Sequence, residues 1–343
     1  MKINKIMLAC AASLLIGASV PTVVVAQPLA PIPEALGAPR EFATAIEHFE
    51  YLKRQAGGGT HHTYESVPKW EGLWQAGYNN IALRGGVSPF FEGPIPPGLS
   101  AGGTVSEGVL SPEYQAAFEQ RRENMLKYNE QPYDRLSTCE AVGPARWLLE
   151  PYVREFVNTP TQSWWMNDLA NETRRIYIDQ EHKNIEGAHT PDGDSIGFWA
   201  GDKLVVHTQD IWPADYFRGY PPTSNELEMV EVWELVTLPN GLQRIEVQVT
   251  FYDPIGLAKP LNGVYTYTRA AAQEDAGYRL RHWDCNSSVQ QRVETEDGVE
   301  TTIRLPGEAG KSWHEMRNPD LPPDLPGQTQ SPDQVDFDTI FSN

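Results

Sequence analysis

The chain has 343 residues, of which 46 are acidic and 27 are basic, so its formal net charge at pH 7 is −19. Nucleic acids and anionic membrane surfaces repel so acidic a protein, and both are excluded as expected partners. Hydrophobic residues make up 40% of the chain, which is enough for an ordinary core. The length favours one large domain with appendages over two small domains.

The first 26 residues are typical of a secretory signal. Lys2 and Lys5 precede an interrupted apolar stretch, and Val24-Val25-Ala26 forms a small-residue cleavage site. A lipoprotein anchored at Cys10 is the weaker alternative, because too little apolar sequence precedes that residue. We therefore expect a signal peptide at 1–26 and a periplasmic or secreted protein without stable membrane insertion. Loss of the two lysines would bring the net charge to −21.

Two helices are predicted before the strands. Apolar residues recur at helical spacing within 33–55, at Phe42, Ile46, Phe49 and Leu52, and three glycines follow from Gly57. We expect this helix to belong to an N-terminal appendage (27–69) that packs its apolar stripe on the main body. A second helix is predicted near 112–129, inside a β-rich domain that spans 70–305.

From residue 174 onward, apolar and polar residues alternate with a period of two, which is typical of strands. The predicted strands are 174–179, 195–200, 203–208, 228–237, 243–252, 263–269 and 278–285, followed by a hairpin at 290–295 and 299–305. Short turns join many of them, as at Pro239-Asn240-Gly241. The pattern predicts a mainly β fold, an antiparallel meander closing into a calycin-like barrel or a strongly curled sheet, with N-terminal helices. An open sandwich is the alternative.

The C-terminal segment and the cysteines complete the organisation. Residues 306–343 become rich in Pro, Asp and Gln, which predicts an extended tail. Once the signal is removed, Cys139 and Cys285 are the only cysteines. A pair of cysteines in an exported chain indicates a disulfide, with two free thiols as the alternative.

The segment 193–208 allows two interpretations. Gly193, Ser195 and Gly197 match the G-x-S-x-G pattern of serine hydrolases, whose serine lies on a sharp turn from a strand into a helix. The residues after Ser195 cannot begin a durable helix, and Gly201-Asp202 is a good two-residue turn. We therefore predict a β-hairpin and reject Ser195 as a nucleophile.

Acid–base chemistry is a second candidate. In such a hairpin, Asp194 and His207 approach one end of neighbouring strands, and a barrel would bring them together at its mouth, with His182 nearby. The alternative is that His207 is one polar residue on a half-exposed strand. A metal held by His182, His189 and Asp194 is disfavoured against a solvated loop, because the spacing fits no standard ligand set. No metal or other cofactor is expected.

Aromatic residues on the predicted strands suggest a binding cavity or a well-filled core. The candidate ligand-binding residues are Trp199, Trp233, Tyr265, Tyr267 and Trp283. Polar residues interleaved with them allow a cavity of mixed character, of the kind that holds a small organic molecule.

Several motifs resemble those of a large family of exported bacterial proteins with no established activity. They include Trp70-x-Gly72-x-Trp74, the run from Arg174 to Asp179, and the run from Ser195 to Thr208, and the resemblance spans about 70–285. Members of this family often carry other polar residues at positions 194 and 207, which argues against a fixed catalytic pair there. The resemblance implies export and the extent of the domain, but no reaction.

Three functions from different classes remain. The leading hypothesis is an exported β-barrel that binds a small apolar or aromatic molecule. The second is an acid–base enzyme (a lyase, isomerase or hydrolase) that uses Asp194, His207 and His182 at the barrel mouth. The third is a cell-envelope interaction protein without a pocket. Whether the protein is an enzyme stays open, as do its ligand and its oligomeric state.

Overall fold

The computed structural model describes residues 41–76, 108–128, 135–183, 188–216, 221–283, 285, 289–295 and 298–304. The predicted signal (1–26), the beginning of the N-terminal appendage (27–40) and the predicted tail (306–343) lie outside them.

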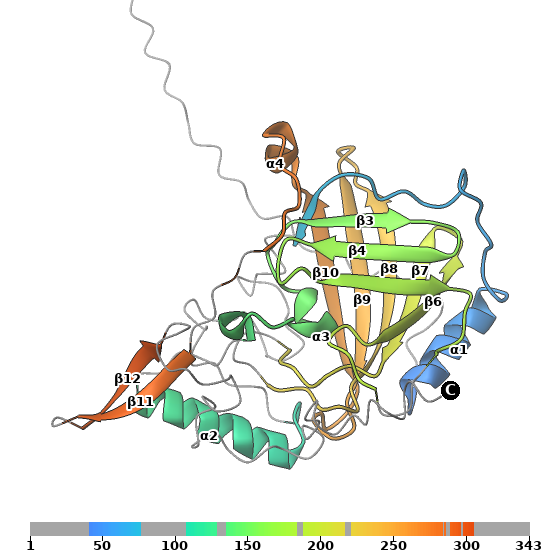
Figure 1. Cartoon of the computed structure of the whole chain (residues 1–343). Coiled ribbons are helices and arrows are strands. Elements are labelled where there is room, and N and C mark those ends of the chain that lie inside the picture. The colour runs from blue at the N-terminus through green and yellow to red at the C-terminus, as the bar shows by residue number, and fades with distance from the viewer. Residues whose placement is uncertain are drawn as a thin grey trace, which may run out of the picture.

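Nine strands form a closed barrel, which confirms the predicted mainly β barrel fold (Figure 1). Around the barrel the order is β1-β10-β9-β8-β7-β6-β5-β4-β3. The strands are β1 (Trp74–Ala76), β3 (Arg154–Asn158), β4 (Gln162–Asn167), β5 (Thr173–Ile178), β6 (Asp194–Ala200), β7 (Lys203–Gln209), β8 (Glu228–Thr237), β9 (Gln243–Tyr252) and β10 (Leu261–Arg269). Closure depends on the pairing of Trp74 in β1 with Arg154 in β3.

One strand pair departs from a simple meander. β5 and β6 run parallel, with Ile176 opposite Ser195, whereas the other neighbours in the barrel are antiparallel. Parallel strands need a crossover connection longer than a tight turn. The connection between Ile178 and Asp194 provides it, and His182 lies on this connection.

Side chains along β9 alternate between the barrel core and the outer face, as predicted. Ile245, Val247, Val249 and Phe251 are all buried in the barrel core. The turn before β9 is also as predicted, since Gly241 has a φ of 81° and Leu238 N–H donates to Leu242 O at 2.8 Å. Burial of every second residue explains why this strand is readable from the sequence.

One predicted strand does not form and three strands were not predicted. Residues 278–283 form no strand, and the unpredicted strands are β1, β3 and β4. Residues 278–283 are held instead to the turn between β4 and β5, where Trp283 N–H donates to Asn171 Oδ1 at 2.7 Å. Side-chain hydrogen bonds to a neighbouring turn thus replace a sheet ladder.

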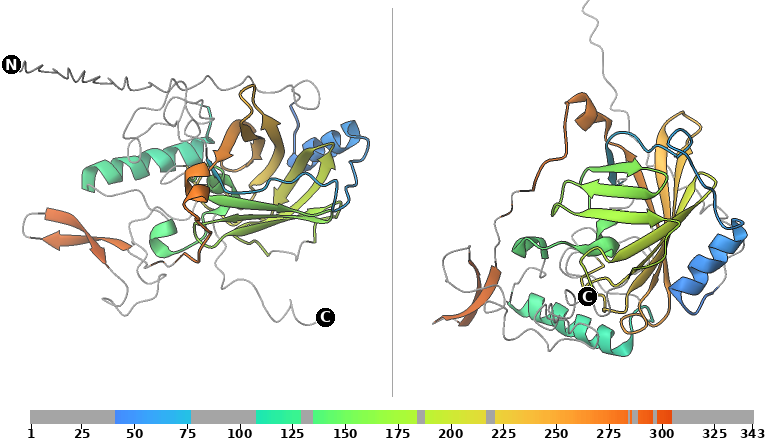
Figure 2. Two further views of the ribbon diagram at one scale, coloured as in Figure 1. Left: turned by 90° about the horizontal axis from the view of Figure 1, so that it is seen from above. Right: turned by 45° about the vertical axis from the view of Figure 1, so that its right-hand side comes forward.

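Helix α1 (Ala45–Gln55) covers part of the outer surface of the barrel, beside β7, β8 and β9 (Figures 1 and 2). Thr44 caps the helix, since its hydroxyl accepts from Glu47 N–H at 3.3 Å. Phe49 and Leu52 pack on Phe198 and on neighbouring outward-facing residues of the sheet. Ile46, expected in the same stripe, is 42% exposed. The predicted packing of this helix on the main body is confirmed through Phe49 and Leu52, and Phe42, before the helix, is partly buried against the same cluster.

The remaining elements are not part of the barrel sheet (Figure 1). They are α2 (Pro112–Tyr128), the 3-10 helix η1 (Arg135–Thr138), α3 (Gly143–Trp147), α4 (Ala271–Asp275) and a separate hairpin of β11 (Val289–Thr295) and β12 (Gly298–Arg304). The predicted disulfide joins Cys139 to Cys285, with 5.8 Å between their Cα atoms. It ties the segment before α3 to the chain that follows the barrel.

Candidate functional site

Ser195 faces the barrel interior and is not arranged as a nucleophile. It is paired with Thr208 across the β6–β7 hairpin, and the two hydroxyl oxygens are 2.8 Å apart. The serine is buried, and a strand follows it instead of the helix that a nucleophile elbow requires. The β-hairpin prediction is therefore confirmed.

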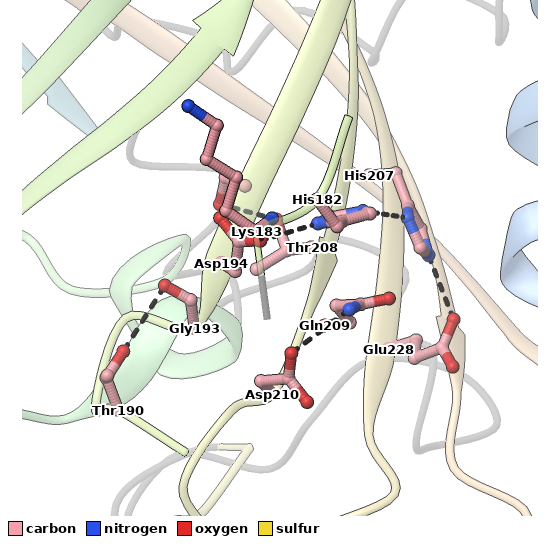
Figure 3. Close-up of polar contacts among 11 residues, drawn as sticks. His182, Lys183, Thr190, Gly193, Asp194, His207, Thr208, Gln209, Asp210 and Glu228 are labelled. Carbon is pink, nitrogen blue, oxygen red and sulfur yellow. Dashed lines mark hydrogen bonds and ion pairs between the residues drawn. The ribbon is translucent and has the colours of Figure 1, made fainter. Parts of the chain in front are cut away.

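Four side chains form a continuous hydrogen-bonded row, which we call the proton chain (Figure 3). Asp194 Oδ2 lies 2.9 Å from His182 Nδ1, and His182 Nε2 lies 2.8 Å from His207 Nδ1. His207 Nε2 in turn lies 2.9 Å from Glu228 Oε2. The three residues predicted from the sequence, Asp194, His182 and His207, are thus brought together, and Glu228 joins them.

The proton chain lies on the outer surface of the barrel. His207 is opposite Ile196 and Val230 in the strand register, and both of these pack beneath α1. The ring of Phe49 in α1 lies 5.6 Å from the ring of His207. The prediction that these residues flank the mouth of the barrel interior was therefore wrong. Because successive side chains of a strand point to opposite faces, His207 points away from the interior, whereas its neighbour Thr208 points inward.

Exposure varies along the proton chain. The side chain of His207 is 1% exposed and that of His182 is 14% exposed, whereas Asp194 is 23% and Glu228 is 37% exposed. The two imidazoles are therefore the enclosed part, and the carboxylates reach solvent at the two ends.

The pKa values of Asp194 and of the nearby His48 are lowered in this arrangement. The hydrogen bond from His182 holds the pKa of Asp194 below its usual range, and Lys183 N–H also donates to this carboxylate at 3.1 Å. His48, on α1, has its pKa lowered to about 4, first by burial and then by the charge of His207. Its Nδ1 lies 3.0 Å from the hydroxyl of Tyr252.

Glu228 was not predicted, although a signal for it exists in the sequence. It is the first residue of β8 and has the same parity as Val230, which lies opposite His207. Extending the alternation by two residues would have placed its carboxylate beside that ring.

His189 does not join the proton chain. Its Nε2 lies 3.0 Å from the backbone oxygen of Asn225. Across the residues that the structure describes, no three His, Cys, Asp or Glu side chains are grouped so that they could hold a metal ion.

Four of the five predicted ligand-binding residues lie inside the barrel. Trp199, Trp233, Tyr265 and Tyr267 are at most 3% exposed and belong to the interior cluster. Trp283 does not, since it follows α4 and is bound to Asn171 on the turn between β4 and β5. The prediction for Trp283 rested on a strand that does not form.

Aromatic rings pack closely in the interior. Trp233 lies 4.2 Å from Trp165 between ring centroids, and it stacks on Tyr267 at 5.5 Å with an interplanar angle of 5°. Trp147, from α3, stacks on Trp165 at 6.0 Å. Trp70, from the segment before β1, lies 5.8 Å from Trp199.

Two fully buried arginines accompany these rings. Arg174 forms a two-pronged salt bridge with Glu231, at 2.7 and 3.2 Å, and donates to Thr208 Oγ1 at 3.1 Å. Arg154 donates instead to backbone oxygens, among them Glu150 O at 2.7 Å. Its guanidinium carbon lies 4.3 Å from the ring of Trp147. Burial lowers the pKa of Arg154.

Several donors in the interior lack an acceptor within the part of the chain that the structure describes. They are the indole N–H groups of Trp70, Trp147, Trp199 and Trp233 and the Nε–H groups of Arg154 and Arg174. By contrast, the indole of Trp165 donates to Ser163 Oγ at 2.7 Å. More than nine in ten buried polar groups in proteins have a partner, so this concentration is unusual.

A buried acid lies near the N-terminal end of α3. The Glu172 carboxylate accepts from Val142 N–H at 2.8 Å and from Gly143 N–H at 3.0 Å. Burial, reinforced by the charge of Asp192, nevertheless raises the pKa of Glu172 to about 8. Burial also raises the pKa of Asp192, against the opposing effect of Arg174.

Comparison with protein-family models, with curated proteins and with solved structures finds no match to this chain. Among the helices in the described ranges, none is long and apolar enough to cross a membrane.

Proposed function

We propose that this protein is an exported β-barrel whose interior binds a small molecule with a flat apolar or aromatic body and hydrogen-bond acceptors. The observation that carries the proposal is a set of four buried indole N–H groups, at Trp70, Trp147, Trp199 and Trp233, that have no acceptor among the described residues. Each unpaired buried donor costs about 1–3 kcal/mol. A bound acceptor would recover that free energy.

The chemistry of the interior supports the same ligand class. Flat rings such as those of Trp233 and Tyr267 offer stacking surfaces, which favour an aromatic or apolar ligand. The nearby Nε–H groups of Arg154 and Arg174 are further donors for its polar atoms. Binding sites of this kind combine an apolar lining with a few placed polar groups.

Export is part of the proposal. The sequence begins with a stretch typical of a secretory signal. The Cys139–Cys285 disulfide suits an oxidising compartment such as the periplasm.

Acid–base catalysis by the proton chain is less well supported. A general base needs an atom that is free to reach a substrate proton. All four ring nitrogens of His182 and His207 are already within hydrogen-bonding distance of another group. We therefore prefer ligand binding to an enzymatic reaction.

Native mass spectrometry of protein purified from the periplasm, without added ligand, tests the proposal. We expect a retained molecule that is released on denaturation. Trp233→Phe replaces the indole with a smaller aromatic ring and removes a donor that has no acceptor among the described residues, and should weaken binding by ~1 kcal/mol, about fivefold. Trp165→Phe is a comparison variant, because its N–H already has a partner inside the protein. Recovery of a ligand-free protein under these conditions would refute the proposal.

A further inference from the structure

We infer that the ligand of the barrel interior is an anion, and that its carboxylate or similar oxyanion binds beside the guanidinium of Arg154. This rests on the proposed function and names the chemical class of that ligand. Three observations carry it. The buried charge of Arg154 lacks a counter-ion among the described residues, its guanidinium is held in place, and the donors around it lack acceptors there.

The structure describes three arginines that are almost fully buried, and Arg154 is the one without an ion pair. Arg174 is neutralised by Glu231, and Arg146 forms a salt bridge with Glu150. The Glu150 carboxylate also acts on Arg154, but it is bound by Arg146. An arginine in a protein keeps its proton, and buried charges are normally paired. A negative group is therefore missing beside Arg154.

The carboxyl group of Glu172 does not supply this charge. The strand register places Arg154 opposite Asn167, whose side-chain N–H donates to the Glu172 carboxylate at 3.5 Å. Glu172 therefore precedes β5, two strands away from β3, and it is bound to backbone N–H groups near the start of α3. Because burial raises the pKa of Glu172 to about 8, its carboxyl group is mostly uncharged at neutral pH.

The guanidinium of Arg154 is held in place before any ligand binds. Its terminal nitrogens donate to the backbone oxygens of Trp147, Glu150 and Tyr152, the last two at 2.7 and 3.2 Å. Its central carbon lies 4.3 Å from the centre of the Trp147 ring and 4.7 Å from that of the Tyr267 ring. A group fixed in this way loses little freedom when a ligand binds.

Donors without acceptors surround this charge. Among the described residues, neither the Nε–H of Arg154 nor the indole N–H of Trp147 has an acceptor. The same is true of the indole N–H of Trp233, whose ring lies 6.3 Å from that of Trp147. An ionised carboxylate has two acceptor oxygens and no donor, so it matches this set. A neutral amide would bring N–H groups for which these donors offer no acceptor.

Titration with 2-naphthoate and 2-naphthamide tests the inference, because the two probes share one flat body and differ in charge. The full-length protein is first freed of retained molecules by unfolding and refolding with its disulfide intact. Calorimetry at pH 7 then gives both dissociation constants. We expect 2-naphthoate to bind at least about tenfold more tightly, since hydrogen bonds to charged groups are the stronger ones. Arg154→Gln should remove this preference.

Arg175→Gln is the matched control. It makes the same change of charge on β5, where Arg175 is exposed and packs on the ring of Trp164, and it should keep the preference. A preference that survives Arg154→Gln, or that is lost in Arg175→Gln, would overturn the inference.

The wild type alone also decides, even where Arg154→Gln does not fold. Equal binding of the two probes, tighter binding of 2-naphthamide, or binding of neither would overturn the inference. Native mass spectrometry gives a separate answer on the proposed function. Recovery of a neutral molecule from the periplasmic protein would support an interior ligand and overturn only its anionic character.

Discussion

At the scale of single residues, Glu172 is the clearest case of a side chain whose ionisation is controlled by its surroundings. Glu172 is 4% exposed, and its carboxylate accepts from two backbone N–H groups, which favours the charged form. Burial and Asp192 act in the opposite direction and prevail, raising the pKa to about 8. At neutral pH the folded protein therefore holds a proton at Glu172 that the unfolded chain releases.

The sign of the pH dependence follows from the raised pKa. The contribution of Glu172 to stability is fully present below its unfolded pKa, near 4.5, and is lost as the pH rises toward about 8. Since one pKa unit corresponds to about 1.4 kcal/mol, the loss amounts to several kcal/mol. Glu172→Gln has no ionisable group at this position and should not show this loss. The free energy of unfolding of the variant should therefore increasingly exceed that of the wild type as the pH rises from about 4.5 to about 8.

Urea unfolding at several pH values measures this difference. Glu50→Gln, at an exposed position on α1, is the control and should leave the pH profile unchanged. Parallel profiles for Glu172→Gln and the wild type would show that Glu172 is not protonated in the folded protein.

At the scale of elements, α1 is attached to the barrel through a small apolar surface. Phe49 packs against Phe198 at 5.2 Å between ring centroids, and Leu52 lies in the same cluster. Because the helix has only 11 residues, it depends on this packing for its stability. It also covers His207, so its docking keeps the centre of the proton chain enclosed.

Phe49→Ala should therefore detach α1 before the barrel unfolds. Truncation of a buried phenylalanine costs about 3–5 kcal/mol. Hydrogen exchange should show loss of protection in α1, with β8 and β9 still protected. Ile46→Ala is the matched control, because Ile46 is on the same helix but is 42% exposed. Equal effects of the two variants would exclude docking through Phe49.

Two of the three strands that the sequence did not reveal share one property. β3 and β4 turn polar residues toward the interior, including Arg154, Ser163 and Asn167, all of which are buried. An alternation of polar residues inside with Trp164 and Met166 outside conceals the usual strand pattern. The Thr159-Pro160 turn between these strands was a usable signal, since Thr159 and Gln162 close it by a 2.8 Å backbone hydrogen bond.

At the scale of the whole molecule, the disulfide joins segments that are far apart in the sequence. Cys139 and Cys285 are 146 residues apart, and nearly all the barrel strands lie between them. A crosslink across so long a loop reduces the entropy of the unfolded chain.

The double substitution Cys139→Ser with Cys285→Ser should lower the free energy of unfolding by ~5 kcal/mol in the chain-entropy model. Chemical denaturation of both proteins, with and without a reducing agent, measures the change. The reductant should destabilise only the wild type. A difference below ~1 kcal/mol would show that the unfolded chain is not constrained as this model assumes.

The sequence alone was enough to predict a barrel, its best-patterned strands, the disulfide and three of the four residues in the proton chain. It could do so because periodicity and short turns act between residues that are near in the chain. The tertiary structure alone decided how β1 and β3 close the barrel and how β5 and β6 pair in parallel. It also decided that His207 lies on the outer surface beneath α1. These features depend on contacts between distant segments, and a period of two does not say which face of a strand is inside.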